Sequence, residues 1–159
     1  LLLLRNLGSV KKHQHDLIGI NSRLDTIQAV ILNKKLKSIL NANEKRRKVA
    51  IIYDKAFNNI KQIKITKTNP GSSRHLYVIR VKNRDALIRF LFKNGISSQI
   101  HYPYCLNKLK AFRKIISKKN KLINAEKWSK ECLSLPIYPN IKINDVNKVI
   151  KKVKEFCKR

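Results

Sequence analysis

Apolar residues recur at helical spacing through the first third of the chain. The earliest of them follow one another at intervals of four or five residues: Ile27, Ile31, Leu36 and Leu40. The pattern resumes over residues 49–57 after a polar stretch, and such spacing places apolar side chains on one face of a helix. We therefore expect a helix over residues 25–57, which either bends near residues 41–43 or forms one long connection between two bodies.

The start of this helix carries a capping signal. In Ser22-x-x-Asp25 the hydroxyl of Ser22 can accept a backbone N–H, and the carboxylate of Asp25 favours the positive helix N-terminus. The segment Leu1–Gly8 resembles the last turn of another helix, closed by a glycine. Because the chain begins within such a pattern, we expect further sequence to precede it.

Beyond Ile60 the apolar pattern changes to short strands and helices. We expect strands over residues 63–65, 76–81 and 96–100, and helices that begin at Asn83, Asn124 and Asn144. A basic loop and a helical stretch extend to Lys119. The order predicts an α+β architecture, in which a long helix is followed by a compact unit of mixed helices and strands.

The net charge of +28 at first suggests nucleic-acid binding, because clustered basic side chains neutralise phosphates. Lysines, however, occur in nearly every segment, and Lys, Ile and Asn together account for 64 of the 159 residues. All three have A/T-rich codons, so compositional drift of a genome raises them together. Neither zinc-finger spacing nor an aromatic RNA-binding pattern is present. Drift therefore explains the charge better, and a basic nucleic-acid-binding domain stays as the alternative.

The remaining composition bounds the environment of the protein. No apolar run reaches the ~20 residues that cross a bilayer. Cys105, Cys132 and Cys157 form no CxxC pair and are odd in number, which favours a reducing compartment, and we expect a cytoplasmic protein. His13 and His15 stand two residues apart without a third ligand nearby, so no metal site is expected.

Three segments in this order resemble one family. They are Gly19-Ile20-Asn21-Ser22-Arg23-Leu24-Asp25 with Gln28-Ala29, then Gly95-Ile96 with His101-Tyr102-Pro103, then Ala125-Glu126 with Leu133-Ser134-Leu135-Pro136-Ile137-Tyr138-Pro139. They are similar to the G-x-N-x-R-x-D-x-x-Q-A, G-I-x-x-x-x-H-Y-P and A-E…L-S-L-P-x-Y-P segments of the DegT/DnrJ family. These enzymes are pyridoxal-phosphate-dependent sugar-nucleotide aminotransferases of the aspartate aminotransferase fold type.

The resemblance covers the whole chain, but only as the C-terminal part of a longer enzyme. It implies that residues 1–24 are the end of the large domain with a cofactor-contacting loop, that residues 25–57 are the long interdomain helix, and that residues 58–159 are the small C-terminal α+β domain. The lysine that forms the Schiff base is expected upstream of Leu1, so we assign no catalytic residue here. Without that lysine the chain is expected to be inactive alone, because the amine must condense with the pyridoxal aldehyde.

The resemblance assigns binding roles to four residues. Asn21 matches an asparagine that reaches the cofactor phosphate of the neighbouring subunit in a homodimer; otherwise it bonds only its own backbone at the helix entry. Arg23, two residues on, can bind a substrate diphosphate or the cofactor phosphate through its guanidinium, or it pairs with Asp25 or a neighbouring acid. His101 and Tyr102 match residues that border the sugar pocket, while a histidine satisfied within the core is the other interpretation. His75 is a further, weaker candidate for this pocket.

The function implied by the resemblance is transfer of an amino group from an amino acid, glutamate being the usual donor, to a nucleotide-linked keto-sugar. The form Gly-x-Asn-Ser-Arg-Leu-Asp favours a 3-keto-6-deoxyhexose as acceptor, in cell-surface polysaccharide or deoxyaminosugar biosynthesis. Dehydratases of the same family replace the lysine by histidine, and that position lies outside this chain. A third possibility is a remnant with no function of its own, whose apolar helix faces would lie open.

Overall fold

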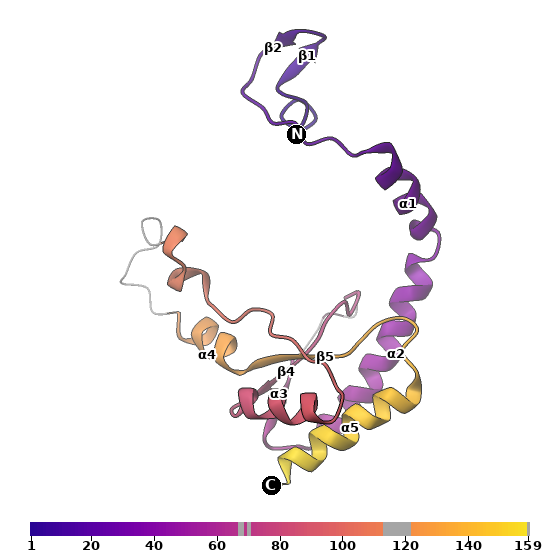
Figure 1. Cartoon of the computed structure of the whole chain (residues 1–159), viewed down its shortest axis with the longest axis vertical. Helices are drawn as coiled ribbons and strands as arrows, with labels where there is room; N and C mark the ends of the chain where they lie inside the picture. The colour runs from indigo at the N-terminus through magenta and orange to yellow at the C-terminus, as the bar shows by residue number, and fades with distance from the viewer. Residues whose placement is uncertain (67–68, 70, 113–121, 159) are drawn as a thin grey trace. The chain divides into compact units, whose positions relative to one another are not determined.

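The structure is a computed structural model that describes residues 1–66, 69, 71–112 and 122–158. The chain divides into two compact units, residues 1–40 and residues 41–159, which we call the N-terminal and C-terminal units. Figure 1 shows the course of the chain through both. No helix within the described ranges is long and apolar enough to cross a membrane.

The N-terminal unit contains a small hairpin and one helix. Strands β1 (Ser9–Lys11) and β2 (Gln14–His15) pair antiparallel, and helix α1 spans Thr26–Leu36. The sequence does not reveal this hairpin, because the residue with a left-handed backbone in its turn is His13, at φ +66°, where glycine or asparagine is usual. The start of the chain has one helical hydrogen bond, from the N–H of Arg5 to the carbonyl of Leu1 at 3.0 Å, and Gly8 has the positive φ of a glycine cap, at +69°.

The stretch predicted to be helical over residues 25–57 consists of two helices. Helix α1 ends at Leu36 and helix α2 spans Ile39–Phe57, so the break falls at Lys37 and Ser38, before the bend expected near residues 41–43. Both the N–H and the hydroxyl of Ser38 donate to the carbonyl of Lys35, at 3.1 and 3.0 Å. Serine thus offers that carbonyl a local partner in place of the helical ladder. The capping expected from Ser22 is wrong as well, because α1 begins later, at Thr26, and Asp25 before it makes no side-chain cap.

Helix α1 has no buried residue, although its apolar residues recur at helical spacing. Ile27 and Ile31, one helical turn apart on the same side, are 75% and 50% exposed. Val30, Leu32 and Leu36 are exposed as well. Contiguous apolar side chains on a surface promote association, so this helix face is a site for self-association of the chain.

We expect the double substitution Ile27→Lys and Ile31→Lys to reduce self-association of the chain without loss of stability, since neither side chain packs in a core. Sedimentation velocity over a range of concentrations measures the association. The matched control is Lys34→Gln with Lys35→Gln, which changes charge on the same helix and leaves the apolar face intact. Equal association of the unsubstituted chain and the Ile27/Ile31 variant would contradict the role of this face.

The C-terminal unit is built on a three-stranded antiparallel sheet of order β3-β4-β5. The strands span Ile63–Ile65, Tyr77–Val81 and Cys132–Leu135. Val81 of the central strand β4 pairs with Ile63, and Tyr77 pairs with Leu135. Buried and half-buried residues alternate along β4, as expected for a strand with one face on a core. The strands expected over 63–65 and 76–81 are therefore confirmed.

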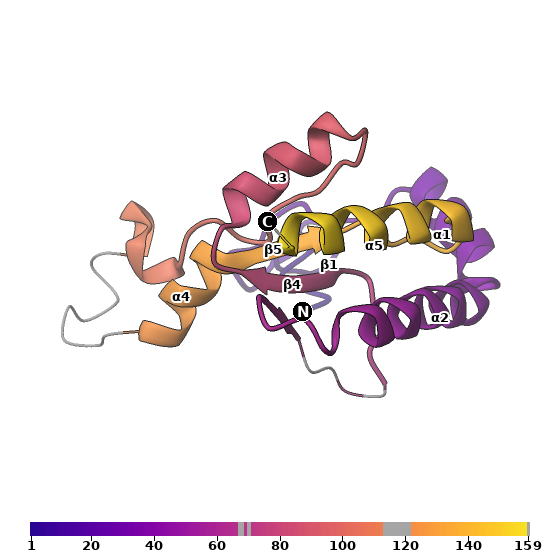
Figure 2. The same cartoon turned by 90° about the horizontal axis from the view of Figure 1, so that it is seen from below.

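Helices α2, α3 (Arg84–Lys93) and α5 (Ile143–Cys157) contribute to the same core as the sheet, and Figure 2 shows them around it. Tyr53 and Phe57 of α2 stack with ring centroids 5.7 Å apart, and Tyr53 lies 4.8 Å from Tyr77 of β4. The aromatic cluster thus joins α2 to the central strand.

Helix α4 spans Ile123–Glu131, and two short 3₁₀ helices, η1 and η2, span Leu106–Lys108 and Lys110–Phe112.

Several local expectations are wrong in detail. The strand expected over residues 96–100 reduces to one antiparallel bridge between Gln99 and Ser134. Helices α4 and α5 begin at Ile123 and Ile143, one residue before the asparagines expected to cap them, and neither has a side-chain cap. Asparagine lies inside the first turn in both, so its capping preference is overridden by the packing of the helix. Residues 113–121, where part of the basic stretch before Lys119 was expected, lie outside the described ranges.

Candidate functional site

The segment that carries Asn21 is held by backbone hydrogen bonds to the start of the chain. The N–H of Ile20 donates to Leu4, that of Ser22 donates to Arg5, and that of Leu7 donates back to Ile20, at 2.8, 2.8 and 3.1 Å. This close approach explains Gly19: a Cβ there would lie 2.3 Å from the N of Gly8. Only a residue without a side chain fits, so the glycine of the G-x-N segment is a packing requirement.

Asn21 forms the antiparallel bridge to Asn6 through its backbone and is exposed. Its amide has no hydrogen bond within the described ranges, so the interpretation in which it bonds its own backbone is not what the structure has. Arg23 likewise makes no ion pair with Asp25 or with any other described residue. Both side chains are therefore available to a ligand, and each is a hydrogen-bond donor suited to phosphate.

Arg23 lines a groove of about 730 Å³ in the N-terminal unit together with the β1–β2 hairpin. We call it the Arg23 groove, and its other basic side chains are Lys11, Lys12, His13 and His15. Nδ1 of His15 lies 3.0 Å from the carbonyl oxygen of Leu7; because a carbonyl only accepts, this nitrogen carries the proton. The groove contains no carboxylate among its lining residues, which favours an anionic ligand.

His101 lies in the C-terminal unit, in the wall of a hollow of about 230 Å³. Its Nδ1 shares a hydrogen bond of 2.9 Å with Oγ of Ser134 on β5, and Gln99 pairs with the same residue through two backbone bonds. The imidazole is thereby oriented by the sheet. We call this the His101 hollow; its other polar side chains are His75, Ser97, Ser98, Gln99, Ser134 and Tyr138.

None of the 11 residues that line the His101 hollow is Lys, Arg, Asp or Glu, in a chain where 37 of 159 residues are Lys or Arg. Hydroxyl, amide and imidazole groups remain, and these bind neutral hydroxyls rather than phosphates. The Oγ of Ser98 is buried without a hydrogen-bond partner in the described part of the chain. A buried unpaired hydroxyl costs about 1–3 kcal/mol, which a ligand hydroxyl or a water would recover.

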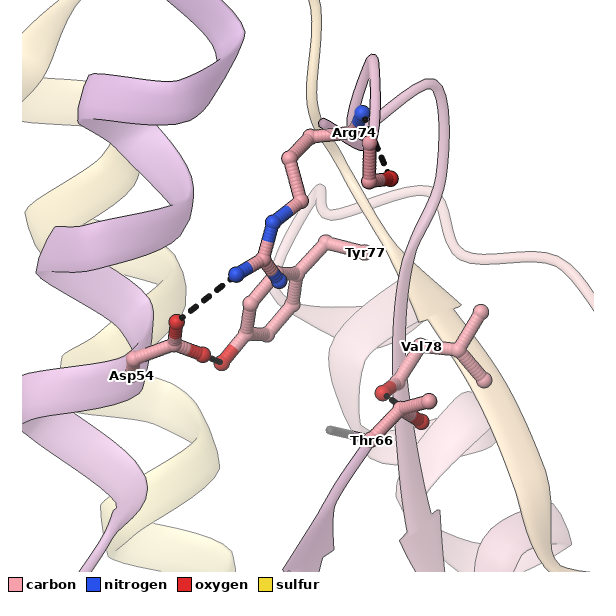
Figure 3. Close-up of polar contacts among 6 residues, drawn as sticks. Asp54, Thr66, Arg74, Tyr77 and Val78 are labelled. Atoms are coloured by element: carbon pink, nitrogen blue, oxygen red, sulfur yellow. Dashed lines mark hydrogen bonds and ion pairs between the residues drawn. The ribbon is translucent and has the colours of Figure 1, made fainter. Parts of the chain in front are cut away.

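The segment before β4 carries His75 and is tied to helix α2 by the contacts drawn in Figure 3. The hydroxyl of Tyr77 donates to Oδ1 of Asp54 at 2.8 Å, and Nη2 of Arg74 lies 3.5 Å from Oδ2 of the same carboxylate. The backbone of Arg74 is left-handed, at φ +51°. Asp54 therefore contacts residues on both sides of His75, which places this imidazole at the rim of the His101 hollow.

Tyr102 behaves differently from its neighbour. Its ring meets His101 edge-on at 5.5 Å, but it is 71% exposed and is not among the residues that line the hollow. The peptide bond between these two residues is cis.

The sequence does not single out Ser98 or Ser134, since serines carry little signal by themselves. Tyr138, which belongs to the third matched segment, contributes to the wall of the hollow.

Cysteines and histidines give no sign of a metal or thiol site. Across the described ranges no three His, Cys, Asp or Glu residues gather as metal ligands. Burial raises the pKa of the Cys132 thiol, which keeps it in the unreactive protonated form. Sγ of Cys105 is buried, 3.4 Å from Oγ of Ser129, and does not line the His101 hollow.

Comparison with known proteins identifies the class of this chain. Residues 1–154 match the DegT/DnrJ/EryC1/StrS aminotransferase family. The chain is 35% identical to a pleiotropic regulatory protein of Geobacillus stearothermophilus, over 97% of this chain and 42% of that protein. It is 34% identical to the dTDP-3-amino-3,6-dideoxy-alpha-D-galactopyranose transaminase of Aneurinibacillus thermoaerophilus, over 97% of this chain and 42% of that protein.

Among solved structures, the chain is similar to S. venezuelae DesV in complex with a ketimine intermediate. The TM-score is 0.92 at 32% identity, and the alignment covers 99% of this chain and 43% of that one. The chain therefore belongs to the DegT/DnrJ/EryC1/StrS aminotransferase family and has the fold of part of a fold-type-I aminotransferase. Aminotransferases of this family depend on pyridoxal phosphate. The chain spans about two fifths of the length of these relatives.

Proposed function

We propose that this chain is the C-terminal part of a pyridoxal-phosphate-dependent aminotransferase, which moves an amino group from an amino acid to a nucleotide-linked keto-sugar. The observation that carries the proposal is the similarity of nearly the whole chain to DesV, at a TM-score of 0.92 and 32% identity. The relative from A. thermoaerophilus is named as a transaminase of a 3-amino-3,6-dideoxy sugar nucleotide. We infer a 3-keto-6-deoxyhexose linked to a nucleotide as the acceptor, and glutamate as the donor.

The linings of the His101 hollow and the Arg23 groove favour different chemical groups. The His101 hollow, with neutral hydrogen-bonding side chains, suits the hydroxyls of a sugar ring, and His101 is the side chain oriented for it. Tyr102 stays a candidate for a more distal part of the substrate. The Arg23 groove offers cations and no carboxylate, which suits a diphosphate.

This chain is expected to contribute few binding groups to the cofactor. Pyridoxal phosphate supplies the aldehyde that takes up the amino group and the ring that stores the electrons. The exposed amide of Asn21 is a donor that fits its phosphate, and in a homodimer it would serve the neighbouring subunit. We propose residues 1–24 as the end of the cofactor-binding domain, residues 25–57 as the interdomain segment and residues 58–159 as the small domain. The chain by itself should therefore catalyse no amino transfer.

The test is to express the reading frame that contains Leu1 together with the sequence that precedes it. The longer protein should bind pyridoxal phosphate, seen in its visible absorbance, and should convert a dTDP-linked 3-keto-6-deoxyhexose with glutamate to the amino sugar. His101→Ala should raise KM for the sugar nucleotide by up to about tenfold, since a hydrogen bond between neutral groups contributes about 0.5–1.5 kcal/mol. Asn21→Ala should weaken retention of the cofactor.

The control is Tyr104→Ala, which removes an exposed ring that lines neither the His101 hollow nor the Arg23 groove. A preceding sequence without a large domain, or without the cofactor lysine or its histidine replacement, would refute the proposal. Release of water from the sugar without amino transfer would instead assign a dehydratase. An unchanged KM in His101→Ala would remove His101 from the site and leave the family assignment untouched.

A further inference from the structure

A second cavity of the C-terminal unit lies at the opposite end of strand β4 from the His101 hollow. Its volume is about 560 Å³, within the range of small-molecule sites. The hollow meets the chain at His75 and Leu76, just before β4, whereas this cavity meets it at residues 80–83, where β4 ends. The four steps of the strand between Tyr77 and Val81 span about 13 Å. The two sites share no lining residue.

The cavity concentrates positive charge. Five of its 11 lining residues are cationic: Lys61, Lys64, Arg80, Lys82 and Lys127. Its one carboxylate, Glu131, is already occupied, because Nε and Nη2 of Arg80 both donate to its Oε2 at 3.1 and 2.7 Å. None of the four lysines has an ion pair with a described residue. We call this site the basic cavity.

Arg80 gives the basic cavity a fixed donor. Its guanidinium is held by Glu131 and lies over the ring of Trp128, 5.7 Å from the centroid. Its Nη1 has no hydrogen bond within the described part of the chain. A guanidinium oriented on two sides loses little freedom when it binds an anion, so it is a better phosphate ligand than a free surface arginine.

One wall of the basic cavity is apolar. Val81 is almost fully buried, and Phe156 and Cys157 from the end of helix α5 are half-buried beside it. The amide of Gln62 donates to the carbonyl of Cys157 at 2.9 Å, which ties the start of the sheet to this helix end. An aromatic ring and aliphatic carbon next to unpaired ammonium groups fit a ligand that has both a flat or apolar body and phosphates.

We propose that the basic cavity is a second binding site, separate from the His101 hollow, for a small phosphorylated molecule with a planar body, of the nucleoside-diphosphate class. The phosphates contact Arg80 and the lysines, and the planar body lies on the Phe156 and Cys157 wall. General basicity of the surface does not explain the site: the His101 hollow, with the same number of lining residues in the same unit, contains no cation.

The test is a calorimetric titration of the 159-residue chain with ADP, with adenosine and with inorganic pyrophosphate at a constant ionic strength. ADP should bind more tightly than either half of the molecule. The double variant Lys82→Gln with Lys127→Gln should weaken ADP binding by about tenfold or more, because two charge-assisted contacts are lost. The control is Lys93→Gln with Lys151→Gln, which removes the same charge from exposed positions outside the cavity and should leave the affinity unchanged.

Protection of Cys157 supplies an independent readout. Cys105 and Cys132 are buried, so Cys157 should be the first thiol to react with a thiol reagent, and saturating ADP should slow its reaction about tenfold. Three results would overturn the proposal: no binding of ADP at millimolar concentration, equal weakening by both double variants, or pyrophosphate binding as tightly as ADP. A duplex oligonucleotide that binds the cavity more tightly than ADP would also overturn it, in favour of nucleic acid.

Discussion

Replacement of Leu133 by alanine is expected to lower the free energy of unfolding of the C-terminal unit by about 2–5 kcal/mol. Leu133 is on β5, is fully buried and belongs to the core cluster that joins the sheet to helices α2, α3 and α5. Truncation removes the transfer free energy of the side chain and leaves a cavity that a rigid sheet cannot close. Urea unfolding followed by circular dichroism measures the loss.

The control for this prediction is Leu106→Ala in the same unit. Leu106 begins the short helix η1 and is 61% exposed, so its truncation should change the free energy of unfolding by less than about 0.5 kcal/mol. Similar losses in the two variants would mean that the packing of the sheet is not what stabilises this unit. A large loss in Leu133→Ala alone would support the core described above.

The stability of the C-terminal unit is expected to fall steeply above pH 10. Burial raises the pKa of Tyr53 and of Tyr77 far above the ordinary value of 10.0, and for Tyr77 the hydrogen bond to Asp54 adds to the effect. Below pH 10 both phenols are protonated in the folded and unfolded states, so their contribution is fully present. Above it the unfolded chain releases protons that the folded chain retains, and each tyrosine costs about 1.4 kcal/mol per pH unit.

Tyr53→Phe isolates this effect. The variant loses the hydrogen bond from Tyr53 to the carbonyl of Pro136, at 3.0 Å, and should be less stable at neutral pH by about 1 kcal/mol. Above pH 10 its stability should fall less steeply than that of the unsubstituted chain, so the two curves approach and cross. Lysines also titrate in this pH range, in every variant. Tyr104→Phe, at an exposed tyrosine, is therefore the control, and its stability should fall with pH as steeply as that of the unsubstituted chain. Parallel curves for Tyr53→Phe and the unsubstituted chain would refute the prediction.

The candidate site could be predicted from the sequence only where a residue belongs to a motif. His101 and Asn21 stand in recognisable segments; His101 lines the hollow and Asn21 is exposed, and their binding roles stay predictions. Ser98 approaches the His101 hollow because the bridge of Gln99 to β5 brings it there, and the contacts of Asp54 place His75, which the sequence offers only as a weaker candidate. Asp54 lies 20 residues from Arg74 and 23 from Tyr77, so its role depends on a contact that no local pattern encodes.

The helix breaks show the same limit at the level of secondary structure. The apolar spacing predicted helix through residues 25–57, and helix is found over most of this range. The break at Lys37 and Ser38 depends on the hydrogen bond from the Ser38 hydroxyl to the carbonyl of Lys35. The pattern also places Ile27 and Ile31 on one apolar face, and both residues are exposed. Periodicity reports that a face is apolar, whereas burial depends on what packs against it.

For this protein the sequence by itself determined the mixed α+β character, the order of the main helices and strands, and the family, because periodicity and short motifs are local properties. Gly19 belongs to one of these motifs, and its close contact with Gly8 explains why the position needs a glycine. Only the tertiary structure decided which charges meet. It gathered five cations around one cavity and left the His101 hollow with none, although lysines are spread evenly along the chain. Charge distribution in space follows from strand register and helix packing, which join residues far apart in sequence.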